Sequence, residues 1–308
     1  MNQITLRFRP DGLFRILQLT DMHLADVAGR DAVLLSCVPE LIRREKPDLI
    51  ALTGDIACDG SAEHMIEQFT ALYNVMAPFG IPITMTLGNH ESDGFDVASG
   101  RQYPLAEALE ALPLCLFERG PADMGVGNYA LPVYPHDGGS RPAWMLYHLD
   151  CHASRPYRTG ESGTVTSDAY IWPAQIDWLK QTHTALQAAY GAVPSILFDH
   201  VPLPEFNDVW MFEGLSGDHG EKVCCAPVNS GLFAELYRLG DFRAVFAGHD
   251  HTNSFTGKVF GMMLAYGRCS GNLGWCLWPH PHALQSEARR HPKDGSPRLT
   301  DFFARGGR

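Results

Sequence analysis

Residues 14–23 read FRILQLTDMH, an apolar run of strand character that passes directly into a polar loop. Residues 49–55, LIALTGD, repeat this pattern and end on a second carboxylate. Between the two runs, residues 33–44 carry apolar side chains at helical spacing and stop before Pro47. The order strand, helix, strand is that of a βαβ unit, so it predicts two parallel strands joined by a right-handed crossover.

The alternation of strands and helices continues along the chain. Residues 61–76 form a second helical segment with Ser61 as its predicted N-cap, and residues 81–87 form a third apolar run. Further segments of strand character lie at residues 128–134, 143–149, 194–198 and 242–246, with antiparallel strands within 254–265 and helices at 174–190 and 230–239. These segments predict an α/β fold with a parallel sheet at its core.

Three segments lack this periodicity. Residues 154–168 are polar and rich in Gly, Ser and Thr, which predicts a long surface loop, and residues 206–227 form a second loop. Residues 279–308 are polar and basic, so we expect a weakly ordered C-terminal tail. Residues 1–278 are expected to form one domain.

Composition and charge narrow the classes of partner. The chain has 308 residues, 45% of them hydrophobic, and a net charge of -11. An acidic surface repels polyanions, which argues against binding to nucleic acid or to anionic membranes. A phosphorylated substrate remains compatible, because bound cations would reverse the potential locally. No secretory signal and no membrane-spanning run is found, so we expect a cytoplasmic protein. The oligomeric state stays open.

The eight cysteines are scattered and show no CxxC spacing. In a cytoplasmic chain of this length, reduced thiols are expected throughout, including the adjacent pair Cys224-Cys225.

Five short patches bearing histidine and carboxylate recur along the chain, and most follow a predicted strand. They are Asp21-Met22-His23, Gly54-Asp55, Gly88-Asn89-His90-Glu91, His200, and Gly248-His249-Asp250-His251. In an open α/β sheet, ligands bind beyond the carboxyl ends of the strands, so we expect these side chains to meet at one edge. Gly54, Gly88 and Gly248 suit sharp turns or close backbone approach there.

Taken singly, each patch has an ordinary explanation as a turn or a helix cap. Independent turns, however, have no reason to place His, Asp or Asn after five separate strands, so the joint pattern predicts a dinuclear metal site. A mixed nitrogen and oxygen donor set without thiolates suits Zn, Mn or Fe. His148 and His152, which flank Asp150, are interpreted as core or loop histidines and not as a further metal site.

The ordered set D-x-H, GD, GNHE, H and GHxH resembles that of the calcineurin-like metallophosphoesterases and spans Asp21 to His251. The motifs HVPLPEF (200–206), GEKVCC (220–225) and GHDHTN (248–253) are similar to those of the purple-acid-phosphatase-like branch. The chain is of the Asp-x-His type and lacks the tyrosine that follows Gly-Asp in true purple enzymes. This resemblance implies a four-layer α/β/β/α sandwich of two mixed β-sheets flanked by helices. The segment after Gly274-Trp275 departs from the family, because it gives no closing strand.

The resemblance also implies roles for individual residues. One metal would be held by Asp21, His23, Asp55 and His251, and the second by Asp55, Asn89, His200 and His249. Asp55 would bridge two divalent or trivalent ions (Mn, Fe or Zn). His90 would stand beside the substrate phosphate as general acid or electrostatic stabiliser, so His90 and Asp55 are the predicted catalytic residues.

The function implied is hydrolysis of a phosphoester by in-line attack of a hydroxide that bridges the two ions. A phosphomonoesterase acting on a phosphorylated small molecule or phosphoprotein is the first hypothesis. A phosphodiesterase with the same metal core is an alternative, and a non-catalytic metal-binding scaffold protein is a second one. A nuclease is disfavoured, because the chain is acidic and has no basic stripe.

Overall fold

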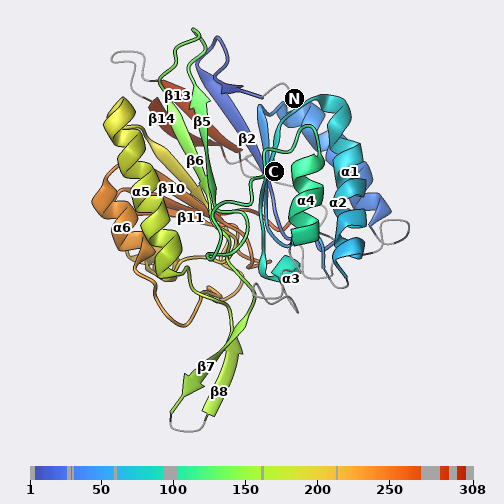
Figure 1. The fold of residues 1–308 in the computed structure, drawn as a ribbon, viewed down its shortest axis with the longest axis vertical. Helices are drawn as coiled ribbons and strands as arrows, with labels where there is room; N and C mark the ends of the chain where they lie inside the picture. Colours follow the sequence, from blue (N-terminus) through green and yellow to red (C-terminus); the bar gives the residue numbers. More distant parts are fainter. Residues whose placement is uncertain are drawn as a thin grey trace.

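Two β-sheets lie face to face, and helices cover the outer face of each (Figure 1). The computed structural model describes residues 4–25, 29, 31–58, 61–92, 103–160, 163–212, 214–271, 285–290 and 297–302. In this part of the chain, the layers follow the order helices, sheet, sheet, helices, as the α/β/β/α prediction requires.

The smaller sheet contains the N-terminal strands and is mixed. Its described strands have the order β14-β13-β2-β3-β4, with β2, β3 and β4 parallel to one another. Their bounds are β2 Leu13–Leu19, β3 Leu49–Thr53, β4 Ile83–Thr86, β13 Gln285–Arg290 and β14 Pro297–Phe302. The predicted β-α-β-α-β start of the chain is confirmed.

The larger sheet has the order β1-β5-β6-β9-β10-β12-β11 among the described strands. Its central strands β6, β9, β10 and β12 are parallel, whereas β5 and β11 run antiparallel to their neighbours. The bounds are β1 Leu6–Arg7, β5 Tyr129–Tyr134, β6 Trp144–His148, β9 Ser195–Phe198, β10 Phe242–Ala247, β11 Thr256–Val259 and β12 Met262–Tyr266.

The helices divide between the two outer faces (Figure 1). The smaller sheet is covered by α1 (Ala32–Glu45), α2 (Ala62–Met76) and α4 (Tyr103–Ala111), and the larger sheet by α5 (Pro173–Tyr190) and α6 (Leu232–Leu239). Ser61 caps α2 as predicted, since its side chain accepts a hydrogen bond from the His64 N–H. The remaining helices that the structure describes are the one-turn helix α3 (Asn89–Ser92) and the 3-10 helices η1 (Ala77–Phe79) and η3 (Pro204–Met211).

Three apolar layers hold the sandwich together. Burial on both faces of a sheet explains why strands such as β3 are continuous apolar runs and not alternating ones. Between the sheets, Leu49 and Ala51 of β3 share a core with Ile196 and Phe198 of β9 and with Phe246 of β10. The sheets are therefore fixed against each other close to the strand ends that carry the polar patches.

The structure corrects the prediction of a long surface loop at 154–168. This segment forms a hairpin of β7 (Arg155–Thr159) and β8 (Gly163–Ser167). Its Thr and Val residues favour strands by β-branching, although the overall polarity of the segment had indicated a loop.

The tail also differs from expectation. Two strands, β13 and β14, lie within residues 279–308, and β13 pairs antiparallel with β2. β13 lies between β2 and β14, so backbone hydrogen bonds to neighbours on both sides hold it in the sheet, although its residues show no apolar periodicity. The boundary at residue 278 stays a prediction, and the rest of the tail lies outside the described residues.

The cysteines agree with expectation in part. Six of the described cysteines are free thiols, including the adjacent Cys224 and Cys225. Cys269 is disulfide-bonded, which corrects the expectation of reduced thiols throughout. Within the described residues, every helix is too short or too polar to span a bilayer.

Candidate metal centre

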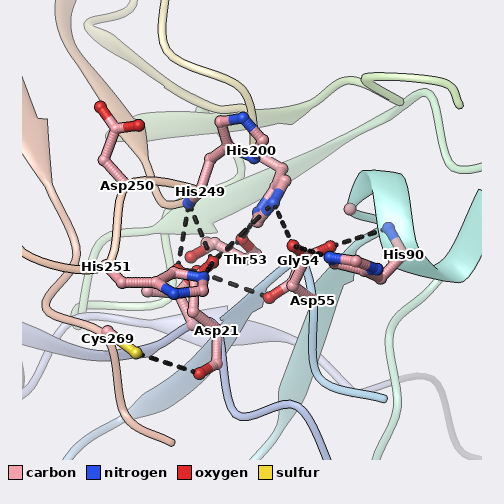
Figure 2. A network of polar contacts seen from close by, with 12 residues as sticks. Asp21, Thr53, Gly54, Asp55, His90, His200, His249, Asp250, His251 and Cys269 are labelled. Carbon is pink, nitrogen blue, oxygen red and sulfur yellow. Dashed lines mark hydrogen bonds and ion pairs between the residues drawn. The ribbon is translucent and has the colours of Figure 1, made fainter. Parts of the chain in front are cut away.

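The polar patches follow parallel strands of both sheets and meet where the carboxyl ends of these strands come together (Figure 2). Asp21 and His23 follow β2, Asp55 follows β3, and α3 begins shortly after β4 with Asn89 and His90. From the other sheet, His200 follows β9, and His249 and His251 follow β10.

Backbone hydrogen bonds continue past the strand ends and hold these loops in register. The Asp21 N–H donates to the Gly54 carbonyl (3.0 Å), and the His23 N–H donates to the Asp55 carbonyl (2.9 Å). Across the two sheets, the His249 N–H donates to the Asp21 carboxylate at 3.0 Å. The loops therefore have fixed positions relative to one another.

One donor group consists of Asp21, His23 and His251, whose ligand-type atoms lie within 4.8 Å of one another. The two Nε2 atoms of His23 and His251 face each other at 2.9 Å. The Asp21 Oδ1 atom lies 3.7 Å from His251 Nε2. This geometry gathers two imidazoles and one carboxylate around a single point.

The second donor group consists of Asp55, His200 and His249, again within 4.8 Å. His200 Nδ1 donates to the Thr53 carbonyl at 2.8 Å, which turns Nε2 toward Asp55 Oδ2 at 3.0 Å. Asp55 also belongs to a third group with His23 and His90. Asp55 therefore lies next to His200 and His249 on one side and next to His23 and His90 on the other.

His90 and Asn89 reach the site from α3. The His90 N–H donates to Asp55 Oδ1 at 3.0 Å, and His90 Nε2 lies 3.9 Å from Asp55 Oδ2. The His90 side chain is 37% exposed, so it borders solvent, unlike the buried Asp55. Asn89 is buried, and its Oδ1 accepts no hydrogen bond from the described residues.

Four of the predicted ligands have a backbone conformation that L-residues rarely adopt. The φ angles are 53° at Asp21, 49° at His23, 51° at Asp55 and 74° at His249. Left-handed backbone at non-glycine residues costs free energy and persists where the surrounding structure imposes it. The strain is concentrated at the donor set.

Close approach requires all three predicted glycines: at Gly88 a Cβ would overlap Asp55, and at Gly54 and Gly248 it would meet a loop of the opposite sheet. Gly54 has φ 89°, and a Cβ there would overlap the His200 imidazole. A Cβ at Gly248 would overlap the Thr20 hydroxyl and crowd Asp21. Since these contacts join loops of opposite sheets, any side chain at either position would push the two halves of the site apart.

Burial and neighbouring charges shift the site's pKa values in opposite directions. Burial lowers the pKa of His23 to about 4, so this imidazole is neutral at pH 7. Burial also acts against a charged His200, but the adjacent Asp55 and Asp21 outweigh it and raise the pKa of His200 to about 10. Despite burial, the same pairing with His200 holds the pKa of Asp55 well below its usual range. Asp55 is thus an anion that requires a positive partner.

Glu91 has a structural role that sequence reasoning missed. Its Oε1 accepts from the N–H groups of Ile56 and Ala57 at 2.8 and 3.0 Å. Its Oε2 accepts from those of Asp55 and Gly88 at 2.9 and 2.7 Å. The buried carboxylate therefore holds the Asp55 loop in place. Its place in the GNHE motif was the feature of the sequence that could have indicated this role.

Asp168 and Asp250 were also missed. Asp168 Oδ2 lies 3.4 Å from His249 Nε2, at the base of the β7–β8 hairpin. The Asp250 carboxylate points away from the cluster (Figure 2) and accepts from the Tyr266 hydroxyl at 2.5 Å and from Asn253 Nδ2 at 2.9 Å. Both carboxylates thus support the GHDH turn from outside the donor set.

His148 and His152 are core residues, as interpreted from the sequence. The His148 ring stacks between Tyr129 and Phe198, and His152 stacks on Trp172 with centroids 3.9 Å apart. Among the described residues, neither belongs to a group with metal-ligand geometry.

The donors present fit metal cations. They combine imidazole nitrogens with carboxylate and amide oxygens, a set that suits Mn, Fe or Zn. Two observations support the fit: the orphaned Asn89 Oδ1, and the facing nitrogens of His23 and His251. Which residue binds which ion stays a prediction.

Residues 14–253 match the calcineurin-like phosphoesterase family. The chain belongs to this family, and the resemblance inferred from its ordered motifs is confirmed.

Particular relatives lie in the purple-acid-phosphatase-like group. The chain is 30% identical over 300 residues to "Probable inactive purple acid phosphatase 29" of Arabidopsis thaliana, covering 88% of this chain and 76% of the relative. It is 28% identical to "Probable inactive purple acid phosphatase 28" of the same plant, covering 91% and 75%. A dimetal phosphatase from Danio rerio has the same fold, with a TM-score of 0.57, 15% identity and coverage of 90% and 92%.

Proposed function

We propose that the protein is a metal-dependent phosphomonoesterase. The observation that carries the proposal is the convergence of two donor groups on Asp55: Asp21, His23 and His251 on one side, His200 and His249 on the other. Asp21, His23, Asp55 and His251 would hold one ion, and Asp55, Asn89, His200 and His249 the second. Bound cations at such a site polarise the phosphoryl group and lower the pKa of water.

The residues of the chain have separate tasks in this reaction. His90 borders solvent beside Asp55, so its imidazole is the group that can donate a proton to the departing alkoxide. Glu91 keeps the Asp55 loop fixed through its hydrogen bonds to backbone N–H groups. The Thr53 carbonyl accepts a hydrogen bond from His200 Nδ1 and so fixes the orientation of the ring, with Nε2 toward Asp55.

A non-catalytic metal-binding protein is the second candidate, because two relatives carry the word "inactive" in their names. The present chain retains every predicted ligand together with His90, which supports catalysis instead. A phosphodiesterase would use the same donors. Rates for an aryl monophosphate and a bis-aryl phosphate at equal metal loading distinguish the monoesterase from the diesterase.

Substitution Asp55→Asn tests the proposal. The amide keeps the shape of the side chain but removes the charge that faces both donor groups, so hydrolysis of an aryl phosphate should fall by at least about 10²-fold. Bound metal, measured by elemental analysis, should fall below two ions per chain. Undiminished hydrolysis in Asp55→Asn overturns the assignment. Two bound ions in the wild type without any hydrolysis would support the non-catalytic candidate.

A further inference from the structure

The β7–β8 hairpin stands out from the body of the molecule next to the metal-site end of the sheets (Figure 1). Its strands pair in the register Arg155↔Ser167, Tyr157↔Val165 and Thr159↔Gly163. Among the described residues, neither strand pairs with a third one, so both outer edges expose backbone N–H and C=O groups.

The base of the hairpin is attached to the candidate metal centre. The Tyr157 hydroxyl donates to the Asp168 carbonyl at 2.7 Å. The Asp168 carboxylate in turn lies 3.4 Å from His249 Nε2. A molecule bound along the hairpin therefore begins its path beside a predicted metal ligand.

The two arginines of the hairpin have no acidic partner. The Arg155 guanidinium lies over the rings of Tyr157 and Tyr170, at 5.7 and 5.5 Å from their centroids. Arg158 is exposed. Within the described residues, no carboxylate lies within ion-pair distance of either. Six other described arginines do form ion pairs: Arg9, Arg43, Arg44, Arg119, Arg238 and Arg268.

The hairpin combines these charges with an exposed apolar contact. Side chains alternate between its faces, so Arg155, Tyr157 and Val165 share one face and Arg158 lies on the other. Val165 is 47% exposed although it is apolar. In a chain of net charge -11, the hairpin therefore carries one cation on each face, and the cation of Arg155 lies on the same face as an aromatic and an aliphatic side chain.

We propose that this hairpin docks an extended, acidic polypeptide segment of a phosphoprotein substrate. The proposal rests on the proposed phosphomonoesterase function and names its substrate class. Five strand residues span roughly 16 Å, so a ligand that reaches both the metal site and the hairpin tip must be longer than a small phosphate ester. The open strand edges accept an extended backbone, and the arginines complement acidic or phosphorylated side chains.

The test compares two phosphoserine peptides of equal length, one with Asp and Glu around the phosphoserine and one with Asn and Gln there. The wild type should prefer the acidic peptide in kcat/KM by about threefold to thirtyfold, as expected for two exposed charge pairs. Arg155→Ala/Arg158→Ala should abolish this preference and leave aryl phosphate hydrolysis within about twofold of wild type. Arg155→Lys/Arg158→Lys should restore part of the preference, because the charge returns.

Arg141→Ala/Arg243→Ala is the matched control, because it removes the same charge outside the hairpin. It should keep the preference of the wild type. Fluorescence anisotropy of labelled peptides measures docking without turnover. Anisotropy that distinguishes the peptides while aryl phosphate is not hydrolysed would support docking and overturn the phosphomonoesterase. Equal affinities for both peptides, or a preference that survives Arg155→Ala/Arg158→Ala, would overturn the docking site.

Discussion

At the scale of single residues, His90 differs from the predicted ligands in its exposure. Its side chain is 37% exposed, whereas Asp21, Asp55 and His200 are almost fully buried. A residue that reaches solvent while its backbone is fixed on Asp55 is placed to meet a substrate. We therefore keep the prediction that His90 acts in proton transfer and not in metal binding.

His90→Ala should lower kcat for an aryl phosphate by about 10²–10⁴-fold, because a positioned proton donor is lost. The metal content should stay at the wild-type value. Steady-state kinetics combined with elemental analysis make the measurement, and His64→Ala on α2 serves as the control with unchanged kcat. Loss of one metal ion in His90→Ala would show that His90 is a ligand.

The sequence predicted the donor residues better than their surroundings. Asp21, His23, Asp55, His200, His249 and His251 could be identified because each follows an apolar run and because family motifs mark them. Asp168 could not, since the contact with His249 depends on how the 154–168 segment folds back. Contacts between residues far apart in the chain, without a shared motif, leave no local signal.

At the scale of elements, α3 is a single helical turn that fixes the position of two loops at the candidate metal centre. Glu91 extends from it to four backbone N–H groups in two loops, those of Asp55, Ile56, Ala57 and Gly88. A helix this short is not stable by itself. It is held by these bonds, and it holds the Asp55 loop in return.

Glu91→Gln should destabilise the fold by roughly 2–5 kcal/mol, because the amide nitrogen cannot accept and leaves buried N–H groups unpaired. Urea unfolding followed by fluorescence measures the effect. Glu40→Gln on α1, where the carboxylate is exposed, should change stability by less than about 0.5 kcal/mol. If both variants unfold at the same urea concentration, the structural role assigned to Glu91 is wrong.

Elements with apolar periodicity were predicted well, and those without it were not. The first two helices and the β2, β3 and β4 strands agree with their predicted ranges to within a few residues. β13 and β14 were not predicted, and β7 and β8 were missed because their side chains are largely exposed and give no apolar pattern. The hydrophobic pattern therefore did not predict the β7–β8 hairpin.

At the scale of the whole molecule, a row of stacked rings crosses the larger sheet and contacts the smaller one. His148 stacks on Tyr129 and Phe198, with centroids 4.5 and 5.0 Å apart, and Phe198 stacks on Phe246. The Thr86 hydroxyl of β4 lies 2.8 Å from His148 Nδ1. A histidine thus sits where the two sheets meet, fully buried.

This position makes stability depend on pH. Burial lowers the pKa of His148 from 6.5 to about 3, so the folded protein excludes a proton that the unfolded chain binds. The stability contributed by neutral His148 is present above pH 6.5 and is lost as pH falls toward 3, by at most roughly 5 kcal/mol. Urea unfolding at pH 7 and pH 4.5 should show a smaller loss for His148→Gln than for wild type. Equal losses in both proteins would rule out His148 as the cause.

The facing pair His23 and His251 is separated by 228 residues, as are Asp21 and His249, whose backbone N–H binds the Asp21 carboxylate. A ribosome adds about 5–20 residues per second, so roughly 10–50 s pass between synthesis of the first and last of these ligands. During that time the nascent chain carries Asp21 and His23 without their partners. A metal ion that needs all three donors Asp21, His23 and His251 can therefore bind only after residue 251 has been synthesised, whereas the donors His23, Asp55 and His90 are all present much earlier.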